Sequence, residues 1–394
     1  MAVSDVVYWV WYSQVKGISN SVKLKFIDMM ESPKEIFTSS GECLKRMNVS
    51  PKIIDKIASA ATIDNIEKYI YLLQKHNDID IVTYYDYQYP KLLTEIDDPP
   101  LVLYYKGDLS VLNARCIAMV GTRDATNKGK YHARSFAQEL AAQGYTVVSG
   151  MAKGIDSYAH LGALSTGKTC AVLGCGVDVV YPSENRDLYN KICEKGLVLS
   201  EFLPSQGPQR WSFPVRNRII SGLCQSTFLV EAPEKSGAIN TVDNALEQNR
   251  DVFVLFDDSD SKEFAGNRKL IEDGATAVHD PYDIMNNTGF TAYDSPRSVI
   301  TVVDITNDET ISDFNAEADR EIEEPVCDEH EEKDITILSD DERTVFTLIK
   351  DGVTHFDDIV SSCDLGVSAV GYALTMLEFN GYIEQSAGKH YKEK

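Results

Sequence analysis

The stretch CIAMVGTRDATNKG, Cys116 to Gly129, begins with an apolar run, turns at a glycine and continues into helical sequence that ends near Gln143. The same succession of apolar run, polar loop and helical segment repeats down to about residue 280. Strands that are buried on both faces read as uninterrupted apolar runs, and the helices between them form crossovers. The pattern therefore predicts an α/β fold with a doubly wound parallel sheet. Its further strands are YTVVSG, TCAVLG, LVLSE, STFLVEA and DVFVLF.

The sheet belongs to a core that we place at residues 79–288, where the Rossmann-like pattern lies. Residues 1–78 carry short amphipathic helices, including SVKLKFIDMM and PKIIDKIASAA. They predict a small N-terminal helical domain of the SAM or helix-hairpin kind.

Two further regions follow the core. Residues 289–337 are acidic and show no apolar period, which predicts a solvated or disordered linker. Residues 338–394 return to a compact pattern with three helix-like segments, which predicts a C-terminal winged-helix-like domain. One helix face there is kept apolar by Val367, Val370, Leu374 and Leu377.

Composition limits the class of protein. Hydrophobic residues make up 43% of 394 residues, and no apolar run is long enough to cross a bilayer, so we expect a cytoplasmic protein with no membrane partner. Eight scattered cysteines without a C-x-x-C pair indicate reduced thiols and no metal site.

The formal net charge is -23, yet residues 115–225 hold 13 lysines and arginines against 8 acids. A local basic surface is therefore expected on an acidic protein.

Ligands of open parallel sheets bind at the carboxyl ends of the strands, so the loops that follow the strands hold the candidate site. Five such loops are rich in Gly, Ser, Asn and Arg or Lys, and the helix after CIAMVG is expected to offer free N–H groups to an anion. Together these loops predict an anion-binding rim. Its candidate residues are Gly121 and Arg123; Ser149, Gly150, Lys153 and Gly154; Gly174, Gly176, Asn185 and Arg186; Phe213, Arg216, Asn217 and Arg218; and Ser236 and Gly237.

Aromatic residues accompany the cations of this rim. Tyr181 precedes Arg186, and Trp211 and Phe213 precede the cluster SFPVRNRIISG. Single-stranded nucleic acid needs this combination, because phosphates meet cations while bases stack on aromatic rings. The alternative is that Phe213 and Pro214 only close the sheet edge. If the cluster is helical, Arg216 and Arg218 diverge by about 200°, and we expect one of them to pin a neighbouring loop or acid instead of binding phosphate.

Signatures of catalysis are missing from the sequence. GCG is not followed by the spacing of a dinucleotide loop, and no phosphate loop of the G-x-x-x-x-G-K-[ST] type occurs. His160 is flanked by Ala159 and Leu161, which favours a hydrogen-bonded helix histidine over a catalytic base. We therefore expect no enzyme, no catalytic residue, no cofactor and no metal.

The order of these motifs resembles that of the DNA-processing protein A family (DprA/Smf). The similarity runs through GTR, SGMAKGIDSYAH, AVLGCGVDVVYPSENRDL, FPVRNRIISGL and NRKLIEDGA, over residues 84 to 280. It implies single-stranded DNA binding, homodimerisation, and protection of incoming DNA with loading of a RecA-type recombinase in natural transformation. It further implies phosphate contacts by Arg123, Arg216 and Arg218 and secondary contacts by Lys153 and Arg186.

The chain departs from the family pattern in two places. The loop DDSDSKEF after DVFVLF is acidic where the family has a Pro-Gly turn, and residues 351–388 contain no Lys or Arg. A recognition helix without cations reads a DNA groove poorly. We infer a protein-facing or autoinhibitory C-terminal module, with the acidic linker as a DNA mimic.

Two alternatives use the same fold. EKSGAINTVDNALEQ resembles the loop of nucleoside-monophosphate phosphoribohydrolases, although Glu247 falls outside their spacing. A nucleotide-binding sensor without catalysis is the other.

Overall fold

The computed structural model describes residues 3–39 and 50–288 and, with short gaps, 339–393. The chain forms two compact units, Met1–Asp304 and Ile305–Lys394. The predicted linker, residues 289–337, lies outside the described residues. None of the helices in the described ranges combines the length and the apolar character that a bilayer crossing needs.

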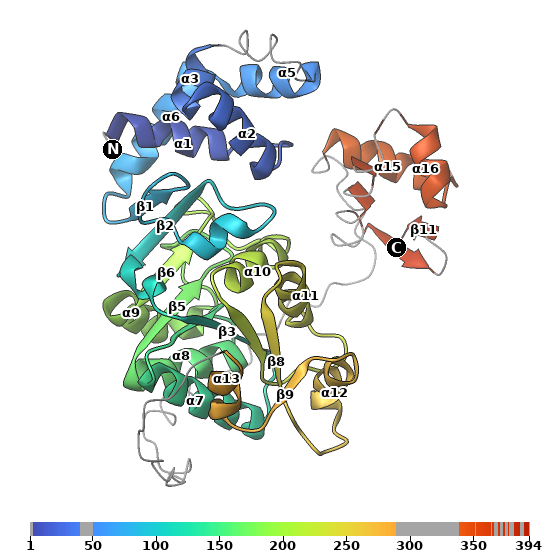
Figure 1. Cartoon of the computed structure of the whole chain (residues 1–394). Helices are drawn as coiled ribbons and strands as arrows, with labels where there is room; N and C mark the ends of the chain where they lie inside the picture. The colour runs from blue at the N-terminus through green and yellow to red at the C-terminus, as the bar shows by residue number, and fades with distance from the viewer. Residues whose placement is uncertain are drawn as a thin grey trace. The chain divides into compact units, whose positions relative to one another are not determined.

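The first unit is built on one large sheet (Figure 1). Its strand order is β1-β2-β6-β5-β4-β3-β7-β8-β9. Strands β3 to β9 pair in parallel, whereas β1 and β2 join the edge in antiparallel fashion. The six predicted strands are all present, so the doubly wound α/β prediction is confirmed. The bounds are β1 (Asp80–Thr83), β2 (Val102–Gly107), β3 (Cys116–Val120), β4 (Thr146–Ser149), β5 (Lys168–Val172), β6 (Leu197–Ser200), β7 (Ser226–Leu229), β8 (Asp251–Leu255) and β9 (Thr276–Val278).

The strand order reverses beside β3, which pairs with β4 on one side and with β7 on the other. In such sheets the crevice for a ligand opens at this reversal, outside the carboxyl ends of the strands. The loops after β3 and β7 therefore meet where a ligand is expected.

Helices cover both faces of the sheet (Figure 1). One face packs against apolar side chains of α7, α8 and α13, and the other against those of α10 and α11. Short 3-10 turns, η1 (Lys91–Glu95), η2 (Leu109–Asn113), η3 (Ser183–Asn185) and η4 (Lys262–Phe264), lie in the connections. The helices are α7 (Asn127–Ala142), α8 (Ile155–Thr166), α9 (Arg186–Lys195), α10 (Ser212–Gly222), α11 (Ile239–Glu247), α12 (Ala265–Glu272) and α13 (Pro281–Asn287).

The N-terminal helices pack as the amphipathic pattern predicts. Trp11 is 1% exposed, and its Nε1 donates to the carbonyl of Ala60 at 2.7 Å. Their apolar core continues into Leu101, Val102 and Tyr104 at β2, so this domain shares one core with the sheet. The helices are α1 (Val3–Ser13), α2 (Asn20–Met30), α3 (Pro33–Thr38), α5 (Pro51–Ala60) and α6 (Ile63–Lys75).

The second unit contains α15 (Asp340–Lys350), α16 (Phe356–Ser362) and the antiparallel pair β10 (Ile383–Ser386) and β11 (His390–Glu393). Of the predicted apolar face, Val370, Leu374 and Leu377 are buried. Val367 lies outside the described residues. A helical core followed by a two-stranded wing agrees with the winged-helix prediction.

Candidate nucleic-acid interface

Arg123 is the exposed cation of the loop that follows β3. Its guanidinium lies 5.7 Å from the centroid of the Phe213 ring. The loop is fixed on both sides, because Thr122 N donates to the carbonyl of Glu231 at 2.7 Å and Ile155 N donates to the carbonyl of Thr122 at 3.2 Å. The sequence therefore places a charged side chain on a rigid loop at the strand reversal, where phosphate can reach it.

Phe213 stands in the first turn of α10 and is the centre of an aromatic and cationic cluster. The Tyr181 ring lies 5.5 Å from it between centroids, and the Arg216 guanidinium lies 6.0 Å from its centroid. Gly174 makes this packing possible, since a Cβ there would come within 2.8 Å of the Phe213 ring. Tyr181 is 43% exposed, which leaves a ring at the rim for a base.

Arg216 forms the floor of the rim rather than its surface. It is 5% exposed and donates through one guanidinium nitrogen to the carbonyls of Gly150 at 2.7 Å and Val172 at 2.5 Å. Burial lowers the pKa of Arg216 to about 10, although Asp156 favours its charge. Asn217 accepts from its Nε at 3.2 Å. The arginine thus ties the ends of β4 and β5 together and supplies positive potential from below.

Arg218 lies on another face of α10. It binds both carboxylate oxygens of Glu201, at 2.8 and 2.7 Å, and its side chain is 14% exposed. Asp98 lies 3.7 Å away. Burial opposes the charged form of Arg218, but Glu201, with a smaller contribution from Asp98, raises the pKa of Arg218. The structure contradicts the predicted phosphate contact by Arg218, because Glu201 and Asp98 already pair with its guanidinium. The expected divergence of the two arginines accounts for this arrangement.

Lys153 and Arg186 flank the rim. Lys153 pairs with Glu184 at 2.5 Å, but both side chains are more than half exposed, so the pair is weak and exchangeable. Arg186 is exposed at the start of α9. The preceding Asn185 donates to the carbonyl of Met151 at 2.8 Å and to Ser157 Oγ at 2.9 Å, which fixes the loop that carries Arg186.

The loop after β4 is closed by its own carboxylate. Asp156 accepts from the N–H groups of Gly150 and Ala152, both at 3.2 Å. Burial raises the pKa of Asp156, and the opposing effects of Arg216 and these N–H groups offset only part of the rise. Ser149 Oγ donates to the carbonyl of Met119 at 2.7 Å and joins β4 to β3.

Glu231 closes the crevice at the strand reversal. It is 0% exposed and accepts from Thr126 N at 3.0 Å and from Thr126 Oγ1 at 2.8 Å. Thr126 in turn caps Gly129 N at 3.0 Å. The expectation that α7 offers free N–H groups to an anion is therefore wrong, because a carboxylate of the chain sits there. The local sequence signal is an acid directly after the apolar run STFLV, but this signal does not indicate Thr126 as its partner.

The glycines of the rim differ in what they require. A Cβ at Gly237 would meet nothing within 4 Å, and Ser236 caps its own loop through a 3.3 Å bond from Ala238 N. Packing therefore does not require a glycine at position 237. A Cβ would instead crowd neighbouring atoms at Gly121, Gly150, Gly154, Gly174 and Gly176.

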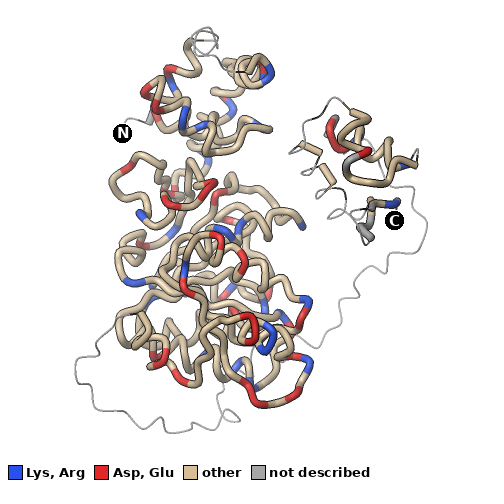
Figure 2. Tube along the Cα trace, turned by 45° about the vertical axis from the view of Figure 1, so that its right-hand side comes forward, with Lys and Arg blue, Asp and Glu red and all other residues tan. Residues whose placement is uncertain are grey.

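The acidic loop after β8 is held by cations of the chain itself. Lys128 forms an ion pair with Asp257, and Arg268 lies 3.5 Å from Asp260. Two acids of this loop are therefore already paired within the chain. Figure 2 shows basic and acidic residues interspersed along the trace of the first unit.

His160 is a structural residue. Its Nδ1 lies 2.7 Å from Thr169 Oγ1, and it is 0% exposed. Burial, with a smaller contribution from Arg216, lowers its pKa to about 3. This agrees with the prediction of a hydrogen-bonded helix histidine.

Comparison with known proteins decides the family. The family model described as DNA recombination-mediator protein A matches residues 80–289, and the DprA winged helix domain matches residues 329–389. Protein Smf of Synechocystis is 33% identical over the full length of both chains. The chain belongs to the DNA recombination-mediator protein A family. The predicted resemblance and the winged-helix part of the fold prediction are thereby confirmed.

Two solved structures of this family share the fold. DNA processing protein A from Streptococcus pneumoniae has 32% identity and a TM-score of 0.58, and the match covers 71% of this chain and 97% of that chain. DNA processing protein A from Helicobacter pylori, described for its single-stranded DNA binding mode, has 31% identity and a TM-score of 0.50. That match covers 54% of this chain and 96% of the other.

Proposed function

We propose that this member of the family binds single-stranded DNA at the rim. The observation that carries the proposal is the exposed Arg123 beside the neighbouring rings of Phe213 and Tyr181. Phosphate would meet Arg123, with Lys153 and Arg186 as secondary contacts, and Arg216 would add potential from the floor. The single-stranded DNA binding described for the Helicobacter pylori relative supports the same function here.

The test is binding of a fluorescent single-stranded oligomer and of its duplex across a salt series. Arg123→Ala is expected to weaken single-strand binding by about 10-fold and to reduce the slope of log affinity against log salt by about 0.7, as for one lost phosphate contact. Lys195→Ala is the matched control, because this exposed residue ends α9 just before β6 and thus lies near the opposite sheet edge. Equal single-strand affinity in both variants would contradict the proposal.

We further propose, as the family resemblance implies, that the bound strand is protected and passed to a RecA-type recombinase by a homodimer. Recombinase filament formation on strands covered by single-strand-binding protein should accelerate with the wild type and not with Arg123→Ala. Light scattering would give the dimer mass. A monomer mass, or acceleration that survives in Arg123→Ala, would count against this part.

We also propose a binding protein rather than an enzyme. Glu247, the residue that the phosphoribohydrolase alternative needs, is the last residue of α11 and is exposed. Since α11 starts after the rim loop and runs away from it for nine residues, this carboxylate cannot act there. Release of free base from a nucleoside monophosphate would overturn this view.

A further inference from the structure

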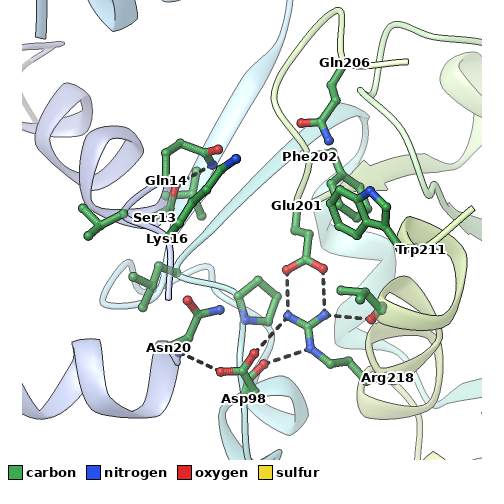
Figure 3. A pocket seen from close by; sticks show the side chains of 15 residues that line it. Ser13, Gln14, Lys16, Asn20, Asp98, Glu201, Phe202, Gln206, Trp211 and Arg218 are labelled. Atoms are coloured by element: carbon green, nitrogen blue, oxygen red, sulfur yellow. Dashed lines mark hydrogen bonds and ion pairs between the residues drawn. The ribbon is translucent and has the colours of Figure 1, made fainter. Parts of the chain in front are cut away.

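A cavity lies on the side of α10 away from the rim, between the N-terminal helices and the sheet. Its volume is about 510 Å³, within the usual range for small-molecule sites. Figure 3 shows Gln14, Lys16 and Asn20 on one side and Phe202, Gln206 and Trp211 on the other. The cavity is thus completed only when the N-terminal domain is docked.

The floor of the cavity holds one guanidinium and two carboxylates. Arg218 is bound by Glu201 and approached by Asp98, and Asp98 also accepts from Asn20 N at 2.7 Å. Because the carboxylates outnumber the guanidinium, the floor favours a neutral polar ligand over an anion. A phosphate would have to stay at the mouth.

The walls carry hydrogen-bonding groups that the protein leaves unused. Within the described residues, the side-chain amides of Asn20 and Gln206 and the indole N–H of Trp211 have no hydrogen-bond partner. Amides offer both donors and acceptors, and a partly exposed indole offers a stacking face. Such a set matches the edge and the face of a nucleobase.

Besides Arg218 in the floor, two exposed cations stand at the edge of this arrangement. Lys16 lines the cavity and is exposed, and Arg210 is exposed directly before Trp211. Neither has an ion-pair partner among the described residues. They would meet the phosphates on either side of a base that enters the cavity.

The cavity and the rim share one element. Trp211 precedes α10 and Phe213 lies in its first turn, so residues two apart in sequence serve the two sites. A strand that leaves the rim across the start of α10 therefore reaches the cavity without a long span.

We propose that the cavity lined by Gln14, Asn20, Gln206 and Trp211 binds a nucleobase. The base belongs either to the strand held at the rim or to a free mononucleotide. The first source rests on the proposed function, and the second does not.

Tryptophan fluorescence tests the site directly. The chain has three tryptophans, of which Trp9 and Trp11 are 6% and 1% exposed, so ligand quenching reports Trp211. An oligothymidylate of about 16 nucleotides, one of about 4, and thymidine monophosphate are titrated separately. A base in the cavity should quench the fluorescence of Trp211. Loss of this quenching in Trp211→Phe would identify Trp211 as its source.

Affinity separates the two sites. Gln206→Ala and Lys16→Ala should each weaken the long oligomer about 5- to 10-fold and leave the short oligomer unchanged. Arg123→Ala should weaken both. Gln74→Ala and Lys52→Ala, exposed residues of α6 and α5 outside the cavity, are matched controls.

Each outcome of these titrations supports or contradicts the proposed base site. Quenching by the long oligomer alone assigns the base to the bound strand. Quenching by the monophosphate assigns the base to a free nucleotide. In both cases Gln206→Ala must weaken binding of the ligand that quenches. If neither oligomer binds, the proposed function fails and the monophosphate titration alone judges the cavity. Absence of quenching by any ligand, with unchanged affinities in Gln206→Ala and Lys16→Ala, would overturn the inference.

Discussion

Gly154 is the residue on which the position of the Arg123 loop depends. Its φ is +74°, and a Cβ there would meet the carbonyls of Thr122 and Arg123. Gly154→Ala should cost about 2 kcal/mol or more of unfolding free energy and weaken single-strand binding, because the loop must move. Urea unfolding and DNA titration measure the two effects.

Gly144→Ala is the control for this prediction. Gly144 has φ +84° but nothing within 4 Å of an added Cβ, so it isolates backbone strain from displacement of the loop. Gly144→Ala should lower the free energy of unfolding by about 1 kcal/mol and leave DNA affinity unchanged. Equal DNA affinity in both variants would show that the Arg123 loop does not depend on Gly154.

His160 makes stability depend on pH. Thr169 Oγ1 donates to the carbonyl of Val147 at 2.7 Å, so it must accept from His160 Nδ1–H, and Nε2 is buried without a partner. Because the folded pKa, about 3, lies below the unfolded value, the stability is complete above about pH 6.5 and is lost as pH falls toward 3.

The loss from this group should reach roughly 2 kcal/mol of unfolding free energy at pH 5. His160→Asn keeps a donor for Thr169 and does not titrate, so its stability should fall less between pH 7 and pH 5. Urea titrations at both pH values give the difference. Parallel pH slopes in wild type and variant would refute this role.

The residue types of the site could be predicted from sequence more fully than their roles. Arg123 after β3 followed from strand position alone, because every strand end of a parallel sheet meets the same edge. The roles of Arg216 and Arg218 depended on which face of α10 each occupies and on Glu201, which no local pattern connects to them. Glu231 was missed for the same reason, since its partner Thr126 is 105 residues away.

At the scale of elements, α10 has two functions on two faces. Phe213 and Arg216 face the rim, and Arg218 holds Glu201. Arg218→Met should cost about 3 kcal/mol of unfolding free energy, because it leaves a largely buried carboxylate unpaired. Affinity for short oligomers should change less than twofold. Urea unfolding and oligomer titration measure these quantities.

The double variant Arg218→Met, Glu201→Met should recover most of that stability, since the buried charge is removed together with its partner. Failure to recover would mean that Asp98 or packing, rather than Glu201, accounts for the loss. A large drop in short-oligomer affinity would show that Arg218 contributes to DNA binding at the rim.

The elements themselves were accessible from the sequence because burial on both faces leaves a strong local signal. Each apolar run between Cys116 and Leu255 became a strand of the parallel part. The antiparallel edge β1-β2 was less evident, since its partner β6 comes about 95 residues later. Long-range pairing of this kind has no periodic signature within one segment.

At the scale of the whole molecule, charge is unevenly distributed along the sequence. The rim depends on a few cations, whereas residues 304–342 carry 17 acids and two basic residues. Most of that segment lies outside the described residues, so its effect is argued from charge alone. A polyanion tethered to a phosphate site competes with DNA at the high effective concentration that a tether gives.

Replacement of the acids between residues 304 and 334 by Asn and Gln should therefore tighten single-strand binding at low salt by about 10-fold. The gain should shrink as salt rises, because screening weakens the tethered competitor as well. Deletion of residues 290–394 should act in the same direction. A variant with the same linker composition in shuffled order should behave as wild type, since the competition requires charge and not sequence. Unchanged low-salt affinity after neutralisation would show that the acidic segment does not reach the rim, and a change with shuffling alone would point to a specific contact instead.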